Sequence, residues 1–160
     1  MSLRLVKPKG YSGTKSSFYT VLDDKKGNNL FSDFLKEWSP EYDAKLFSFI
    51  NRIISMANET SALEIFFKLN EGLESDDLIC ALYDEPNKEM RQYCMRMNEK
   101  IVILGGGGPK FVQKWQEDPK LSKAVHEMML ISKIVRNKIK NGSLYYSSDG
   151  LLFKGDLTII

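Results

Sequence analysis

Three short apolar segments follow one another closely between residues 77 and 104, and they limit the fold more than any other feature of the chain. Each is rich in residues that favour extended backbone: Asp77–Tyr83, Met90–Met97 and Lys100–Leu104. Only the short polar turns 84–88 and 98–99 separate them, and connections of this length join antiparallel neighbours. The unbroken apolar run 101–104 is typical of a central strand with both faces covered. The sequence therefore predicts an antiparallel sheet in this part of the chain.

Segments with helical spacing precede these strands. Apolar residues recur every three or four positions in 29–38 and again in 39–58, which indicates two amphipathic helices. Ser39 and Pro40 predict the start of the second helix, because serine can cap free amides and proline fits the first helical position. A third, short helical piece is expected at 60–69. Its side chains assigned to the core are Ile65, Phe66, Phe67 and Leu69.

The two ends of the chain receive different predictions. Residues 1–17 are polar and contain Pro8, Gly10 and Gly13, so they are expected to be loosely structured. A first strand is predicted at 17–22. After the sheet, Asp118-Pro119 opens a long helix that Asn141-Gly142 ends. In the tail, Ser148-Asp149-Gly150 lies between apolar flanks and predicts a hairpin.

These segments add up to an α+β fold in which N-terminal helices pack on a small antiparallel sheet, followed by a long C-terminal helix and a terminal β-hairpin. The chain has 160 residues, which suits one domain with a core at 18–140 and an additional hairpin at 143–160. No apolar run is long enough to cross a bilayer, and the N-terminus lacks the apolar core of a secretory signal. We therefore expect a cytoplasmic protein with no membrane partner.

The residue types argue against several classes of site. Cys80, Cys94 and the single histidine, His126, have no recognisable zinc-binding spacing, so neither a metal nor another cofactor is expected. The cysteines are interpreted as buried free thiols and His126 as a surface residue. No Ser/His/Asp, Cys/His or HExxH set can be assembled.

Charge is distributed unevenly, although the net charge is only +2. Residues 61–90 carry eight acidic side chains against two lysines, whereas residues 91–140 carry eleven basic side chains against four acidic ones. Such an asymmetry can steer a polyanion or an acidic partner segment to one face of a protein. The alternative is that these charges simply solvate the surfaces of helices and strands.

The basic region contains two groups of candidate site residues. Arg91 and Tyr93 lie two positions apart on one predicted strand and therefore share a face, while Arg96 points to the opposite face. Arginine offers a planar fork for phosphate, and tyrosine offers a stacking ring with a hydroxyl. Alternatively, Arg91 pairs with a surface acid and Tyr93 is half-buried.

The second group follows the last strand of the sheet and combines cations with an aromatic ring. Such a combination suits single-stranded nucleic acid, through charge on the backbone and stacking on the bases. Trp115 can equally be a packing residue against the last helix. The members of this group are Lys110, Gln113, Lys114, Trp115 and Gln116.

Four consecutive glycines, Gly105–Gly108, separate the two groups. A glycine-rich turn can present backbone amides to phosphate, but neither GxxxxGK[ST] nor GxGxxG is present here. We therefore interpret the glycines as a flexible exit from the strand, a hinge that lets Lys110 approach a ligand.

Several of these motifs occur in the same order in a known family. Leu82-Tyr83-Asp84, Met90-Arg91-Gln92-Tyr93 and Ile101-Val102-Ile103-Leu104 are followed by a turn, by Lys110-Phe111-Val112-Gln113-Lys114, and by Pro119 with its helix. This order resembles the RelE/ParE superfamily of bacterial toxins, especially its HigB-like, phage-derived branch, over roughly residues 31–135.

The resemblance implies a metal-independent endoribonuclease that cleaves mRNA, commonly on the ribosome, and that is inhibited by an antitoxin of helix-turn-helix type. On this basis Arg91 and Lys110 are expected to stabilise the phosphate, and Tyr93 to position a base or assist proton transfer. Lys114, Gln113, Trp115 and Arg96 are expected to bind neighbouring substrate. No direct binding of DNA is implied. The alternatives are a catalytically inactive RelE-like domain that binds a helical, antitoxin-like partner, and an unrelated α+β binding protein.

Overall fold

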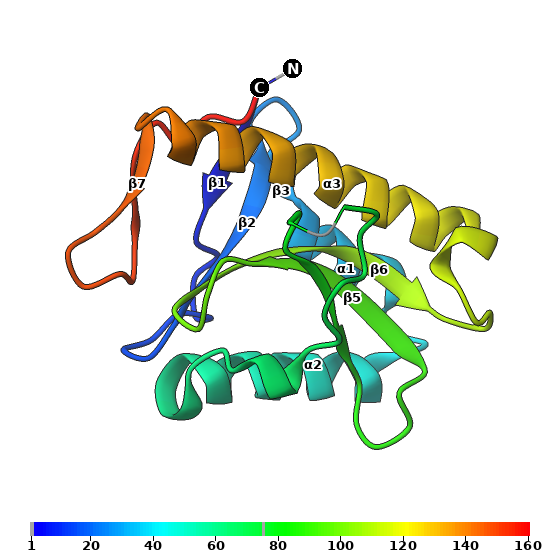
Figure 1. The fold of residues 1–160 in the computed structure, drawn as a ribbon. Helices are drawn as coiled ribbons and strands as arrows, with labels where there is room; N and C mark the ends of the chain where they lie inside the picture. Colours follow the sequence, from blue (N-terminus) through cyan, green and yellow to red (C-terminus); the bar gives the residue numbers. More distant parts are fainter. Residues whose placement is uncertain (1, 75) are drawn as a thin grey trace.

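The computed structural model describes residues 2–74 and 76–160, and it shows the predicted α+β class (Figure 1). Its larger sheet has the strand order β1-β2-β6-β5-β4, and the short strand β3 also pairs with β2. Its strands are β1 (Leu3–Val6), β2 (Ser17–Asp23), β3 (Asn28–Asn29), β4 (Ile79–Tyr83), β5 (Met90–Arg96) and β6 (Ile101–Pro109). The helices are α1 (Leu30–Trp38), α2 (Asp43–Ser55) and α3 (Pro119–Lys140).

The larger sheet is mixed rather than purely antiparallel. Strands β4, β5 and β6 form the predicted antiparallel meander. Strand β2, however, runs parallel to β6, with Phe18 opposite Val102. Both α1 and α2 lie between these two strands in the sequence, and a connection of that length permits a parallel return.

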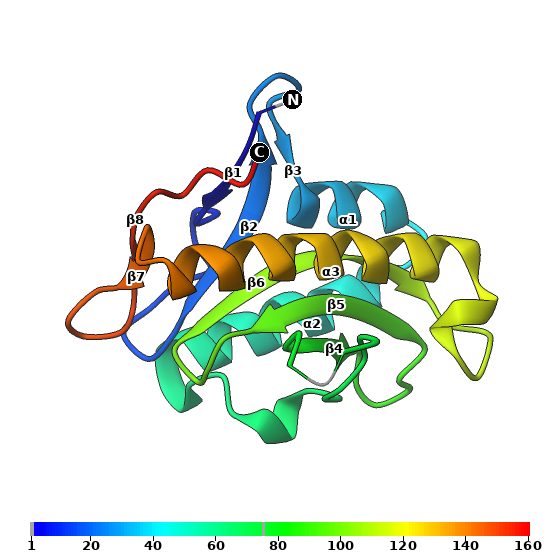
Figure 2. The same ribbon diagram turned by 45° about the horizontal axis from the view of Figure 1, so that its top comes forward.

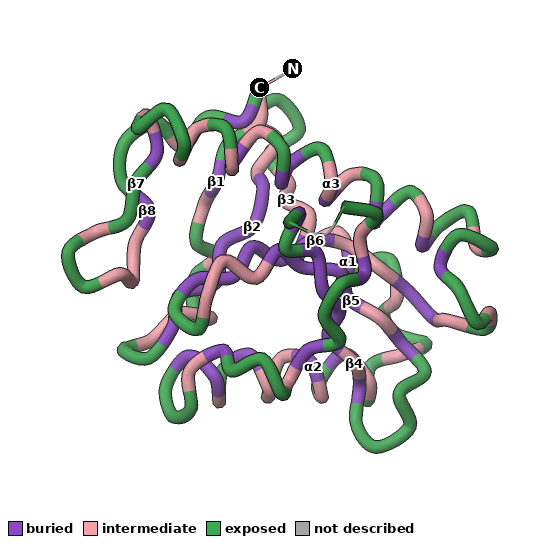
Figure 3. The backbone as a smooth tube through the Cα atoms, viewed as in Figure 1, coloured by how far each residue is buried: buried purple, intermediate pink, exposed green. Residues whose placement is uncertain are grey.

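Helices cover both faces of the sheet, as expected for a central strand with an unbroken apolar run. One core joins Tyr93 and Ile103 to Met128 of α3, and the other joins Cys94 and Val102 to α1 and α2. Figure 2 shows α3 along one face, and Figure 3 shows buried strands between helices whose outer sides are exposed. Alternate residues of β5 therefore point into different cores, which decides where Arg91 and Arg96 lie.

The N-terminal segment, expected to be loosely structured, contains strand β1 at Leu3–Val6. Strand β1 pairs antiparallel with β2, and the Leu3 amide donates to the carbonyl of Ile160 at 3.0 Å. Leu5 is buried in the core beneath α3. The segment is ordered by partners far away in the sequence, which its polar local composition does not indicate.

Two helical predictions also need correction. Helix α2 begins at Asp43 rather than at Ser39-Pro40, and the Ser39 hydroxyl donates to the Asp43 carboxylate instead of capping helix amides. Of the expected helix at 60–69, only the single turn Glu64–Phe66 forms. Lys68 instead forms backbone hydrogen bonds with Ala81 at the edge of β4. Phe67 is buried as predicted, but Ile65 is 84% exposed.

The last part of the chain agrees with the sequence. Asp118 caps α3 by accepting hydrogen bonds from the amides of Lys120 and Leu121, and the helix ends before Asn141. The terminal hairpin pairs β7 (Leu144–Tyr146) with β8 (Phe153–Gly155). Both cysteines are buried and free, and His126 is exposed. Within residues 2–74 and 76–160, no helix is long and apolar enough to cross a membrane.

Candidate functional site

A pocket of about 260 Å³ lies between the loop that follows β6 and the segment that borders β4. We call it the basic pocket, because its wall contains three lysines. The loop contributes Lys110, Gln113, Lys114, Trp115 and Gln116, and the bordering segment contributes Lys68, Asn70, Glu71 and Gly72. All five members of the second candidate group are therefore brought together on one concave surface.

Arg91 and Tyr93 lie beside this pocket, on the face of β5 that α3 covers. The guanidinium carbon of Arg91 is 3.9 Å from the ring centroid of Tyr83, its cross-strand partner on β4. A cation over an aromatic face at this distance is attracted by the ring quadrupole, so Tyr83 holds the arginine in place. The predicted common face of Arg91 and Tyr93 is thus present, with Tyr83 as an additional support.

Three side chains in this region have buried polar atoms without a hydrogen-bond partner. They are Nε and Nη1 of Arg91, the hydroxyl of Tyr93 and Oε1 of Glu71. Glu71 is only 7% exposed and also lines the basic pocket, where Oε1 lies 3.5 Å from Nζ of Lys68. Unpaired buried polar atoms are uncommon in folded proteins, because each costs about 1–3 kcal/mol. The unpaired donors of Arg91 and Tyr93, beside a carboxylate that pairs with Lys68, indicate a polar ligand.

Lys110 is held in a positive environment. Partial burial lowers the pKa of its ammonium group, and the nearby charges of Arg91 and Lys68 lower it further. The carboxylate of Glu71 acts in the opposite direction but does not outweigh them. The basic pocket therefore presents concentrated positive charge around a single buried carboxylate, an arrangement that favours binding of an anion.

Two aromatic candidates have a different role from the one expected. Trp115 is 4% exposed, and its indole Nε1 donates to the carbonyl of Glu71 at 2.7 Å. It therefore packs beneath the loop and forms part of the wall of the pocket, rather than stacking on a base. Tyr93 is fully buried, so it does not contact a base either. Burial raises the pKa of its hydroxyl, which stays a hydrogen-bond donor near neutral pH.

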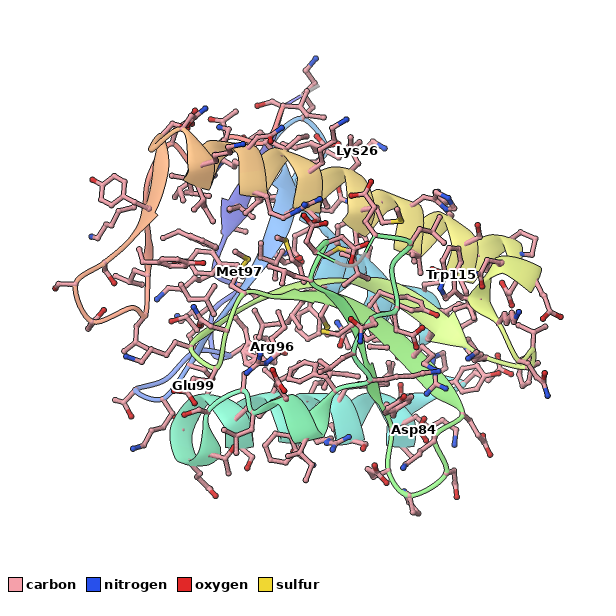
Figure 4. The ribbon with its side chains drawn as sticks, in the orientation of Figure 1. Lys26, Asp84, Arg96, Met97, Glu99 and Trp115 are labelled. Carbon is pink, nitrogen blue, oxygen red and sulfur yellow. The ribbon has the colours of Figure 1, made fainter. Side chains whose placement is uncertain are left out.

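Arg96 lies apart from the other candidates. It points to the opposite face of the sheet, as strand alternation predicts, and lies between the sheet and α2 in Figure 4. Its Nε donates to the carbonyl of Ala62 at 2.8 Å, and Nη1 lies 3.7 Å from the Glu64 carboxylate. The assignment of Arg96 to substrate binding is therefore not supported by its position.

The glycine run is part of strand β6 and not a hinge. A Cβ on Gly107 would lie 2.0 Å from the carbonyl oxygen of Arg91, and one on Gly108 would lie 2.6 Å from the Trp38 ring. Strand pairing continues to Pro109, past a bulge opposite Tyr93. These glycines allow β6 to approach β5 and α1 closely, and this contact holds Lys110 beside Arg91.

Sequence reasoning missed Lys68, Glu71 and Tyr83. The first two were assigned to a helix and a loop, because their pairing with β4 is long-range and leaves no local pattern. Tyr83 pairs with Arg91 across the β4–β5 hairpin, whose register was not predicted from the sequence.

Asp77 and Asp84, which bracket β4, have a structural role. Their carboxylates accept hydrogen bonds from the amides of Ile79 and Met90. In the described part of the chain, no cluster of three or more histidine, cysteine, aspartate or glutamate side chains is suited to a metal ion.

Comparisons of the chain with protein-family models, curated proteins and solved structures give no significant match. Functional inference therefore rests on the basic pocket itself. Its relevant properties are the convergent cations, the unpaired donors of Arg91 and the buried Glu71 carboxylate.

Proposed function

We propose that the basic pocket binds a phosphodiester of RNA and that the protein is a metal-independent endoribonuclease acting on mRNA, like toxins of the RelE/ParE superfamily. The observation that carries this proposal is the gathering of Lys68, Lys110 and Arg91 around the buried carboxylate of Glu71. Cations with unpaired donors suit a phosphate, and a carboxylate among them suits proton transfer. A cytoplasmic site of action follows from an mRNA substrate.

The proposed chemistry uses the ribose of the substrate as nucleophile. Glu71 accepts the proton of the 2′-hydroxyl, whose oxygen attacks the adjacent phosphorus. The bond to the 5′-oxygen breaks, and Lys110 donates the proton that this leaving oxygen needs. Arg91 and Lys68 stabilise the negative charge that develops on the phosphate. A lysine with a lowered pKa is a more effective proton donor near neutral pH than an ordinary one.

The first prediction follows directly from this mechanism. Purified protein is expected to cleave single-stranded RNA or ribosome-bound mRNA in the presence of EDTA, because no step uses a metal. Products are expected to carry a 2′,3′-cyclic phosphate and a 5′-hydroxyl, which end-labelling and mass spectrometry detect. Expression is expected to arrest growth, with relief by a co-expressed antitoxin. If neither free RNA nor translated mRNA is cut, the enzymatic proposal fails.

A second candidate function is favoured by the surface of α2. Phe47 is 62% exposed and Ile54 is 39% exposed, and with Ile50 they form an apolar stripe at helical spacing. Such a stripe suits the apolar face of a partner helix, as expected for an antitoxin with a helix-turn-helix domain. A catalytically inactive interaction domain would keep this surface. The RNA cleavage assay separates the two functions, because only the enzyme cuts RNA.

The lowered pKa of Lys110 leads to a second prediction. The protonated amine binds phosphate, and Lys110 loses its proton at a lower pH than an ordinary lysine. RNA affinity is therefore expected to fall by about tenfold as pH rises through this lowered pKa. Lys110→Arg is expected to abolish the fall, since a guanidinium stays charged. Fluorescence anisotropy of a labelled RNA measures the affinity of both proteins across this pH range. An equal fall in affinity for the Lys110→Arg variant would contradict the assignment of the pH dependence to Lys110.

A further inference from the structure

A second pocket lies on the other side of the Lys110–Phe111 step. We call it the aromatic pocket, because three of its lining residues are Trp38, Tyr42 and Phe111. The others are Glu41, Gly108, Pro109, Asp118, Lys120 and Leu121. Its volume is about 140 Å³. Lys110 lines the basic pocket and the next residue, Phe111, lines the aromatic pocket. Because consecutive Cα atoms are about 3.8 Å apart, the two pockets are immediate neighbours.

The rings of this pocket differ in how firmly they are held. The Trp38 indole donates from Nε1 to the carbonyl of Gly107 at 3.0 Å. Its ring packs edge-on against the Tyr42 ring, with 5.9 Å between the two ring centroids. Lys120 places its ammonium 4.8 Å from the Trp38 ring centroid. Phe111, in contrast, is 80% exposed, and its ring contributes little to the core. An exposed aromatic beside a fixed aromatic pair offers a stacking surface.

We propose that the aromatic pocket holds an unpaired nucleobase of the strand whose phosphate occupies the basic pocket. This inference rests on the proposed binding of RNA and adds a base-stacking site to it. A base is flat and has a π-face whatever its identity, so aromatic rings bind it with little dependence on sequence. Lys110 lies on one side of the pocket and Lys120, which also pairs with Glu37 at 2.9 Å, lies on the other, where both cations can attract the nucleic-acid backbone.

This assignment replaces the stacking role that the sequence suggested for Trp115. That ring is buried, whereas Phe111 occupies a position in the same loop with its side chain in solvent. An apolar side chain of a protein partner is the competing occupant. The nucleobase is favoured because the basic pocket adjoins the site and because Lys120 lies over the Trp38 ring.

The test measures binding of a short, uncleavable 2′-O-methyl RNA and of the same oligonucleotide with abasic positions throughout. Phe111→Ala is expected to weaken binding of the base-bearing RNA about five- to 150-fold, the range for loss of one stacked base. Binding of the abasic oligonucleotide is expected to stay unchanged. Lys110→Ala is expected to weaken binding of both. The matched control is Tyr145→Ala, which removes an exposed ring on β7, at the far end of α3 (Figure 1).

Each outcome has a distinct meaning. Equal affinity of Phe111→Ala and the parent protein for the base-bearing RNA overturns the base site but leaves phosphate binding intact. If the substitution instead abolishes binding of a protein partner and spares the RNA, the pocket belongs to that partner. If the parent protein binds neither oligonucleotide, the proposed function and the base site fail together. Phe111→Tyr keeps an aromatic ring and is expected to retain most of the affinity.

Discussion

Replacing Arg91 with alanine is expected to slow RNA cleavage about 100- to 1,000-fold, the usual loss when one preorganised donor to a developing charge is removed. The guanidinium is held by the ring of Tyr83, and its Nε and Nη1 are buried without a partner. They are therefore free to donate to a phosphate without first breaking another hydrogen bond. Single-turnover cleavage of a labelled RNA, with saturating protein, measures the rate of the chemical step.

Two further variants make this result specific. Arg91→Lys keeps the positive charge but loses the planar fork, so it is expected to recover only part of the rate. Arg4→Ala removes an exposed arginine, paired with Asp24 at the other end of the sheet, and is expected to leave cleavage unchanged. Melting curves are expected to show that all variants remain folded. If the Arg91→Ala variant is folded and cleaves RNA at the parental rate, Arg91 has no role in the mechanism.

The part of the site that strand alternation controls could be predicted from the sequence. The antiparallel meander places Arg91 and Tyr93 on one face and Arg96 on the other, because side chains alternate along a strand. The helix start at Asp118-Pro119 was also readable, since the cap and the proline act within one turn. Both features depend on contacts that are close in sequence or set by a short turn.

The rest depends on pairing between distant segments. Residues 1–17 are polar, yet β1 is held by β2 and by the C-terminal residues of the chain. Lys68 and Glu71 reach the basic pocket because their backbone pairs with the edge of β4. Trp115 is buried because a carbonyl of that same segment accepts its indole proton. None of these partners leaves a periodic signal in the local sequence, so propensity alone could not identify them.

The glycine run shows how composition can mislead about dynamics. Four glycines in a row suggested flexibility, but Gly105 lies against Met128 of α3, and Gly107 lies against the backbone of β5. Close approach, rather than freedom of the backbone, accounts for the small residues here. The glycines therefore have a structural role, and substituting them one at a time can show which positions require glycine.

Gly107→Ala is accordingly expected to destabilise the fold by about 3 kcal/mol, at the upper end of the usual range for overpacking. The added Cβ would lie 2.0 Å from the Arg91 carbonyl oxygen, which belongs to a paired strand and cannot move aside as a side chain can. For a chain of 160 residues this corresponds to a melting temperature lower by roughly 10 °C. Urea denaturation followed by circular dichroism measures the change in the free energy of unfolding.

The neighbouring glycine supplies the matched control. A Cβ on Gly106 would meet nothing within 4 Å, so Gly106→Ala is expected to change stability by no more than about 0.5 kcal/mol. If the run were a hinge, both substitutions would stiffen the backbone in the same way and neither would clash. Small and equal effects on stability at the two positions would therefore support the interpretation of the run as a hinge. A large difference between them would show that close packing of β6 against β5, beside Arg91, requires glycine at position 107.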